Sequence, residues 1–275
     1  MVTYLTGGSG YLGGEIVRAL ALNERTVHAQ VLVPVRDKAG KTGQERFDPL
    51  FSGGRNPHQH ARWVAPAEPI PDDAEVVILN AFDVAFHKDI ARVLRESVAP
   101  TLALLEECSK LSLKTGKLRK VILVSTAYVQ PPLPFKRCDG PITPFHGAAD
   151  PWGLYGKLLN GEMGWQDLVD DKDNDSHFTT NAYIYAKTLL EHLVATFKDL
   201  PCTYIVRPSI IGPSRCGKRG NAASPGCASA KLMDSPVGRF VPSTGCECMH
   251  GLLHTPIYGT HPSETTPLST PRTAA

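Results

Sequence analysis

The stretch TGGSGYLG, residues 6–13, lies between the apolar run Val2–Leu5 and a segment with apolar residues at helical spacing. That order predicts a strand, a glycine turn and a helix. In such a unit Gly7 allows the tight turn, Gly10 lets the backbone approach a pyrophosphate, and Gly13 lets the helix pack closely on the strand. The phosphates then lie over free N–H groups at the helix N-terminus. A glycine turn without a ligand remains the alternative, because the triplet alone is a weak motif.

Composition narrows the class of protein. The 275 residues, 42% hydrophobic and 20% charged, suffice for one substantial core, with or without a small appendage. The 29 basic and 27 acidic residues give a net charge of +2, which argues against a nucleic-acid partner. No apolar run approaches the roughly 20 residues of an integral membrane segment, and no signal-peptide pattern follows Met1. We expect an intracellular, cytoplasmic protein, with association at an organelle surface left open.

The cysteines do not form a recognisable framework. An odd number, seven, is scattered along the chain, which predicts reduced thiols: Cys108, Cys138, Cys202, Cys216, Cys227, Cys246 and Cys248. The last two stand near His250 and His254, but the C-x-C-x-H-x₃-H spacing is not a common zinc framework. We therefore predict no metal site.

A second strand is predicted over Val27–Val35, which is rich in β-branched residues. It is followed by Arg36 and Asp37. At this position an acidic residue usually holds a free ribose 2′-OH, whereas an arginine suits a 2′-phosphate. Arg36 therefore favours NADP, and Asp37 keeps NAD possible. An ordinary solvated charge cluster is the alternative.

Two further apolar runs, Glu75–Asn80 and Val121–Val124, are typical of strands buried on both faces of a parallel sheet. The first leads into Asn80-Ala81-Phe82, and the second leads into Ser125-Thr126-Ala127-Tyr128. The carboxyl ends of parallel strands are where such folds place groups that contact ligands. Capping of the strand end is the alternative for the hydroxyls.

Between these strands the pattern is less regular. Residues 52–73 predict a loop around a weak strand near Trp63, and residues 130–176 predict a long excursion with one or two short helices. Residues 87–110 have helical apolar spacing, with a bend expected at Pro100.

Residues 181–200 predict an amphipathic helix that carries Tyr183 and Lys187 one turn apart on the same side. A lysine ammonium near a phenol favours the phenolate, so we expect Lys187 to lower the pKa of Tyr183 and make it a usable acid or base. Plain surface chemistry is the alternative for such a pair. Tyr185 points elsewhere because it is only two residues from the lysine.

The chain changes character after a further strand, Cys202–Val206, and the segment Arg207-Pro208-Ser209. Residues 214–230 and 255–275 are rich in small and polar residues and predict loop or disorder. We therefore expect a dinucleotide-binding domain over residues 1–214 and an irregular, partly disordered region over residues 215–275.

Taken in order, these signals resemble the extended short-chain dehydrogenase/reductase family, and more closely the reductase domain of fatty acyl-CoA reductases and thioester reductases. The stretches that carry the resemblance are TGGSGYLG (6–13), VPVRDKAGKTGQERF (33–47), NAFDVAF (80–86), VILVSTAYV (121–129), NAYIYAKTLLEHL (181–193) and IVRPSIIGPS (205–214). The resemblance implies an α/β fold, a Rossmann-type doubly wound parallel sheet, with a reduced C-terminal substrate region.

The resemblance also implies an NADPH-dependent oxidoreductase, with NADH as the other possible cofactor, that reduces a fatty acyl-CoA or carrier-bound acyl thioester to aldehyde or alcohol. Tyr183 would protonate the substrate oxygen, Thr126 would hydrogen-bond it, and Lys187 would hold the nicotinamide ribose. The implied cofactor-binding residues are Thr6, Gly7, Gly10, Tyr11, Leu12, Gly13, Arg36, Ala81, Tyr183, Lys187, Pro208 and Ser209. Pro208 and Ser209 would border the nicotinamide end.

One position departs from the family pattern. Ser97 stands where the family usually has an asparagine that belongs to a proton relay. Two other functions therefore stay open: an extended reductase or epimerase for a sugar nucleotide or sterol, and a truncated dinucleotide-binding protein without catalysis. The sequence leaves the oligomeric state open.

Overall fold

The computed structural model describes residues 1–26, 28–51, 61–84, 86, 89–129, 142, 149–171, 179, 181–209, 211 and 254–256. Several predicted features lie outside these residues: residues 52–60 of the predicted loop 52–73, the segment 130–141, and all of 215–275 except 254–256. Five of the seven cysteines, His250 and the side chain of His254 fall outside as well. The expected domain boundary near residue 214 stays a prediction.

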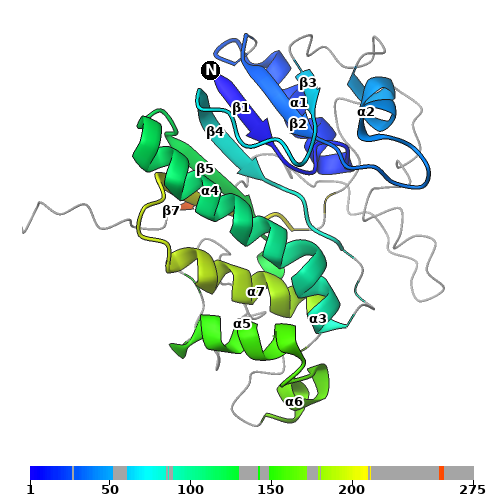
Figure 1. Cartoon of the computed structure of the whole chain (residues 1–275), viewed down its shortest axis with the longest axis vertical. Coiled ribbons are helices and arrows are strands. Elements are labelled where there is room, and N and C mark those ends of the chain that lie inside the picture. The colour runs from blue at the N-terminus through cyan, green and yellow to red at the C-terminus, as the bar shows by residue number, and fades with distance from the viewer. Residues whose placement is uncertain are drawn as a thin grey trace, which may run out of the picture.

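A single sheet organises the described chain, with the strand order β3-β2-β1-β4-β5-β6-β7 (Figure 1). The strands are β1 (Val2–Leu5), β2 (Gln30–Pro34), β3 (Ala61–Val64), β4 (Ala74–Leu79), β5 (Lys120–Val124), β6 (Cys202–Val206) and β7 (His254–Pro256). The first six are parallel, and β7 pairs antiparallel with β6. The order of the parallel strands is that of a doubly wound dinucleotide-binding sheet. The predicted Rossmann-type α/β fold is confirmed.

Successive residues of the central strands pack into two different hydrophobic clusters, because side chains alternate across a sheet. In β4, Val77 and Leu79 join one cluster while Ile78 joins the other. In β1, Tyr4 and Leu5 divide in the same way. Both faces are therefore covered, which explains why these strands are continuous apolar runs in the sequence.

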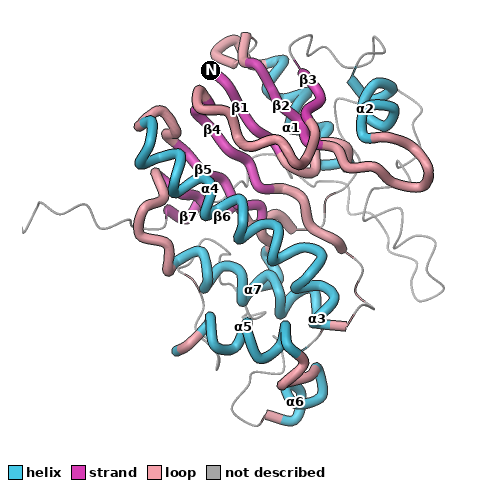
Figure 2. Tube along the Cα trace, viewed as in Figure 1, coloured by secondary structure: helices cyan, strands magenta, loops and turns pink. Residues whose placement is uncertain are grey.

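Helices cover the two faces unequally (Figures 1 and 2). One face carries α3 (Ile90–Val93), α4 (Ala99–Thr115), α5 (Pro151–Asn160) and α7 (Ala182–Ala195). The other face carries α1 (Tyr11–Leu22) and α2 (Gly43–Phe51). The short helix α6 (Trp165–Asp170) follows α5, so the expectation of one or two short helices between residues 130 and 176 is confirmed.

The helix predicted over residues 87–110 differs from its expectation. It runs as α3, a π-helical turn η1 (Leu94–Val98) and α4, and it continues to Thr115. Pro100 lies in the first turn of α4, where a missing N–H is tolerated, and the irregular hydrogen bonding falls just before it. The π-helical turn places Ser97 and Val98 in the core. Such turns often occur beside functional sites.

Within the part of the chain that the structure describes, every helix is too short or too polar to cross a membrane.

Candidate functional site

Thr6 directly follows β1 and joins it to the end of β4. Its Oγ1 accepts hydrogen bonds from the backbone amides of Asn80, at 2.9 Å, and Ala81, at 3.0 Å. The same hydroxyl donates to the Ile78 carbonyl oxygen at 3.4 Å. Through these hydrogen bonds the buried Thr6 side chain joins the carboxyl ends of two neighbouring strands, β1 and β4.

The glycines that follow are required by close backbone contacts. Gly7 has a φ of 67°, and a Cβ there would lie 2.9 Å from the Ala81 Cα. A Cβ on Gly13 would lie 2.2 Å from the Gly7 carbonyl oxygen, which instead accepts the Gly10 amide at 3.0 Å. Gly8, which the sequence argument gave no role, packs against β2, because its Cβ would meet Val33 Cγ1 at 2.5 Å.

The N-terminus of α1 fits a dinucleotide pyrophosphate. Gly10 caps the helix in an extended conformation with no side-chain hydrogen bond, and the first turn contains no acidic residue. No carboxylate of the first turn competes for this position, and the helix dipole favours an anion there. Tyr11 and Leu12 begin this helix, and Leu12 packs into the core beneath it.

The end of β2 separates the two residues that bear on coenzyme choice. Asp37 turns back into the protein, where its Oδ1 accepts the amide of Gly43 at 2.7 Å, near the start of α2. Arg36 is exposed, and its carbonyl oxygen accepts a hydrogen bond from the Arg46 guanidinium. The Asp37 carboxylate, which could hold a ribose hydroxyl, is thus engaged by a backbone amide, while the Arg36 side chain is exposed.

Tyr183, in the first turn of α7, lies among apolar rings and one hydroxyl. The rings of Phe82 and Phe86 meet it edge-on, with centroids at 5.6 Å and 5.5 Å. Burial raises the pKa of Tyr183, and a side-chain hydrogen bond with Thr126 opposes that rise. The expectation that Lys187 lowers this pKa is wrong, because burial dominates. A phenol with a raised pKa stays protonated at neutral pH, so it can donate a proton.

Lys187 is one turn further along α7 and is almost completely buried, with 3% of its surface exposed. Its Nζ donates to the Val124 carbonyl oxygen at 2.6 Å and lies 3.9 Å from the centroid of the Phe82 ring. Burial lowers the pKa of Lys187 to about 7, and the charge of Glu191 opposes this shift. Burial therefore brings the titration of this amine from the alkaline range toward neutral pH.

The sequence argument missed a buried ion pair behind Lys187. Glu191, one turn along α7, accepts hydrogen bonds from the Arg207 guanidinium at 3.1 and 2.6 Å, and both side chains are at most 2% exposed. Arg207 immediately follows β6 and precedes Pro208, whose carbonyl oxygen accepts the Ala127 amide at 2.9 Å. The spacing of Glu191 from Lys187, four residues on a helix, was the signal that could have pointed to it.

Ser97 has a structural contact in place of the relay asparagine. Its hydroxyl accepts the amide of Asp83 at 3.1 Å, and it is 4% exposed. The loop after β4 is thus fastened to the π-helical turn η1. Phe82, which the sequence placed at the carboxyl end of a buried strand, lies between this contact and the one that Thr6 makes to Ala81.

The predicted residues gather in two groups at the carboxyl ends of the central strands. Thr6, the glycines and Ala81 form the turn at β1 and β4, and Thr126, Tyr183 and Lys187 lie at β5 and α7. Phe82 connects them, because it directly follows Ala81 and contacts both Tyr183 and Lys187. Arg36 stands apart at the end of β2, and Ser209 is exposed after β6.

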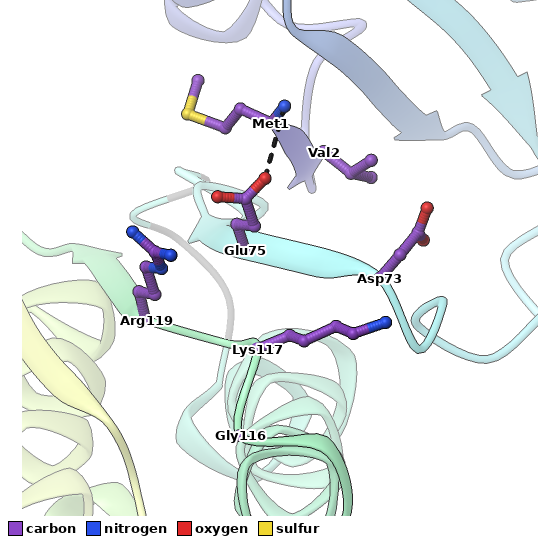
Figure 3. A pocket seen from close by; sticks show the side chains of 7 residues that line it. All are labelled: Met1, Val2, Asp73, Glu75, Gly116, Lys117 and Arg119. Carbon is purple, nitrogen blue, oxygen red and sulfur yellow. Dashed lines mark ion pairs between the residues drawn. The ribbon is translucent and has the colours of Figure 1, made fainter.

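A pocket of about 480 Å³ lies at the opposite edge of the sheet (Figure 3). It is lined by the amino-terminal ends of β1 and β4 and by the turn before β5, and the Met1 amino group pairs there with Glu75 at 3.3 Å. Ligands of open parallel sheets bind at the carboxyl ends of the strands. We therefore assign the functional site to the glycine and Tyr183 edge.

The sequence profile of an NAD-binding family described as "Male sterility protein" matches residues 5–70 and 65–233. The two matched segments together cover strands β2 to β6 and both groups of candidate residues.

Among individual proteins, fatty acyl-CoA reductase 1 of Rattus norvegicus and of Homo sapiens are each 29% identical over 231 residues. The alignment covers 76% of this chain but 43% of each relative, so the chain spans less than half the length of the curated relatives it matches. Among solved structures, the terminal R domain from the myxalamid PKS-NRPS pathway gives a TM-score of 0.48 at 20% identity, covering 76% of this chain and 48% of that one. A likeness at that level adds nothing to the family assignment.

Proposed function

The chain belongs to the NAD-binding family described as male sterility protein, and from this premise we propose that it reduces a fatty acyl-CoA or carrier-bound acyl thioester with NADPH. The observation that carries the proposal is the grouping of Thr126, Tyr183 and Lys187 beside a glycine turn fitted to a pyrophosphate. The names of the matched relatives supply the substrate class.

In this proposal Tyr183 donates a proton to the carbonyl oxygen of the substrate as negative charge develops on it. The phenol is protonated at neutral pH, so a proton is available, and the hydrogen bond with Thr126 opposes the rise in pKa that would weaken the acid. Thr126, hydrogen-bonded to Tyr183, orients the phenol and offers a second contact to the same oxygen. Bound NADPH would supply the hydride.

Lys187 and Arg36 serve the cofactor in this proposal. Lys187 binds hydroxyl groups of the nicotinamide ribose through the donors that Val124 does not occupy. Arg36, with Arg46 beside it, binds the 2′-phosphate, and the engagement of Asp37 at Gly43 supports NADPH over NADH. Pro208 and Ser209 border the nicotinamide end from β6.

The surroundings of Tyr183 favour an acyl substrate over a sugar nucleotide. The two rings that meet the phenol, Phe82 and Phe86, offer no hydrogen bonds, and Phe86 is 61% exposed. A sugar carries hydroxyl groups that lose water on binding and need polar partners in exchange, whereas an acyl chain gains by leaving water.

The test is consumption of NADPH by the purified chain in the presence of palmitoyl-CoA, with the aldehyde or alcohol identified by mass spectrometry. Tyr183→Phe should reduce the rate at least 100-fold, the usual contribution of a general acid. Lys187→Ala should weaken NADPH binding and lower the rate. Tyr155→Phe, which removes a phenol from α5, is the matched control and should leave the rate unchanged. Equal rates for Tyr183→Phe and the unaltered chain would contradict the role of Tyr183.

A dinucleotide-binding protein without catalysis is the second candidate. The specific observation in its favour is that Ser97, where the family usually has the relay asparagine, uses its hydroxyl to accept the Asp83 amide at 3.1 Å. Its signature is NADPH binding by calorimetry with no turnover of any acyl thioester. NADPH binding by calorimetry and NADPH consumption with palmitoyl-CoA therefore separate the two candidates.

A further inference from the structure

Phe82 contacts both members of the Tyr183 and Lys187 pair. The Lys187 Nζ is 3.9 Å from the centre of its ring, which is within cation–π range, and the Tyr183 ring meets it edge-on at 5.6 Å. On its other side the Lys187 Nζ donates to the Val124 carbonyl oxygen at 2.6 Å. The ammonium is therefore held between an aromatic face and a carbonyl group.

The backbone on either side of Phe82 is fixed. The amide of Ala81 donates to Thr6 Oγ1 at 3.0 Å, and the amide of Asp83 donates to Ser97 Oγ at 3.1 Å. Both hydroxyl-bearing residues are buried, Thr6 directly after β1 and Ser97 in the π-helical turn. A ring attached to a backbone that is fastened on both sides has a defined place, so the contact with Lys187 is built into the fold.

We propose that Phe82 is a positioning residue that acts through Lys187: its ring holds the ammonium against the Val124 carbonyl and excludes water from it. The proposal rests on the proposed function only in giving this lysine a role in the reaction. The ring has two opposing effects. Its face attracts the cation and favours the charged amine, whereas its exclusion of water favours the neutral amine.

The other ionisable groups around Lys187 are accounted for. Glu191 on the same helix favours the ammonium, and its charge is itself paired with Arg207 from the end of β6. Tyr183, on the preceding turn, is neutral near pH 7 because its pKa is raised. The lowered pKa of Lys187 agrees with exclusion of water as the larger effect.

The two effects can be separated by three substitutions of Phe82, with Lys187 titrated by NMR in protein labelled at the lysine ε-carbon. The Lys187 signal is assigned by its loss in Lys187→Arg. Phe82→Tyr keeps the ring and should keep the pKa near 7. Phe82→Ala admits water and should raise it by about one unit or more toward 10.5. Phe82→Leu excludes water without an aromatic face, so it should lower the pKa below that of the unaltered chain.

Phe86→Ala is the matched control, because Phe86 is on the same loop and meets the same Tyr183 ring at 5.5 Å. This change should leave the Lys187 pKa unaltered. A pKa that does not move in Phe82→Ala, or that moves equally in Phe82→Ala and Phe86→Ala, would overturn the proposal. The other two variants replace Phe82→Ala if circular dichroism shows that it does not fold. An equal Lys187 pKa in Phe82→Leu and Phe82→Tyr would then overturn the proposal. The titration requires neither NADPH nor a thioester, so its outcome is independent of whether the chain is a reductase.

Discussion

Glu191 and Arg207 form a buried ion pair, with the closest oxygen and nitrogen 2.6 Å apart and both side chains at most 2% exposed. The pair joins α7, which carries Tyr183 and Lys187, to the end of β6. Removing one partner leaves a buried charge uncompensated. Glu191→Gln should therefore lower the free energy of unfolding by about 3–5 kcal/mol, measured by urea denaturation.

Two controls accompany this change. Glu96→Gln removes the exposed pair of Arg92 and Glu96, whose N–O distance is 2.8 Å, and should cost no more than about 1 kcal/mol. The double variant Glu191→Leu with Arg207→Met removes both charges and should be more stable than Glu191→Gln alone. A loss in Glu191→Gln as small as that in Glu96→Gln would contradict the importance of the buried pair.

Two adjacent glycines of α1 should respond oppositely to alanine. A Cβ on Gly13 would lie 2.2 Å from the Gly7 carbonyl oxygen, whereas a Cβ on Gly14 would meet nothing within 4 Å. Gly13→Ala should displace the turn and reduce NADPH affinity at least tenfold by calorimetry. Gly14→Ala should raise the free energy of unfolding by about 0.5–1 kcal/mol, because alanine favours a helix, without weakening NADPH. Equal NADPH affinities in the two variants would argue against the glycine turn as the pyrophosphate site.

Coenzyme preference should depend on Arg36. A hydrogen bond to a charged group contributes about 1.5–3 kcal/mol. Arg36→Ala should therefore weaken NADPH binding roughly 10- to 100-fold and leave the affinity for NADH within about twofold of the unaltered chain. Lys114→Ala is the charge-matched control, since Lys114 pairs with Asp72 at 2.7 Å near the other edge of the sheet. Dissociation constants from calorimetry at fixed ionic strength provide the measurement. A similar loss of affinity for both coenzymes would contradict the proposed contact between Arg36 and the 2′-phosphate.

Lys187 should make stability depend on pH. Its pKa is about 7 in the folded chain and ordinary, near 10.5, when unfolded, so between these values the unfolded chain binds more protons and stability rises with pH. Below pH 7 both states are protonated and the full penalty of burying the ammonium is present. Lys187→Met removes that penalty. Its stability relative to the unaltered chain should be greatest at pH 6 and should fall by on the order of a few kcal/mol by pH 9.

Urea denaturation at the two pH values checks this prediction. The Val124 carbonyl oxygen loses its donor in Lys187→Met, which adds a constant cost at every pH. The informative quantity is therefore the change in the stability difference between pH 6 and pH 9. Parallel pH profiles for the two proteins would mean that Lys187 titrates normally in the fold.

The sequence predicted the parts of the molecule that local patterns determine. Residues close in sequence are enough to predict the apolar strands, the glycine turn and the pair formed by Tyr183 and Lys187. The helix α2 was not predicted, because its apolar face consists of little more than Phe47 and Phe51. The carboxylate that accepts the amide of its first residue, Gly43, belongs to Asp37, six residues before the helix. Strand β7 lies in a stretch whose composition predicts loop or disorder.

The chemistry of the site depended on contacts that no local pattern contains. Burial raises the pKa of Tyr183, and two of the rings around it, Phe82 and Phe86, come from a loop about a hundred residues earlier in the chain. The sequence argument considered only the neighbouring lysine and so predicted the opposite direction. Arg207, which pairs with Glu191, is likewise distant in sequence.

The attachment of the loop after β4 to Thr6 and to Ser97 bears on how this protein could be engineered. Substitutions at Thr6 or in the glycine turn would disturb Phe82, and with it Lys187, so the pyrophosphate contacts and the proton chemistry are difficult to alter separately. Arg36, at the end of β2, has no such connection through the loop. A redesign that exchanges one coenzyme for the other should therefore start at Arg36 and leave the glycine turn intact.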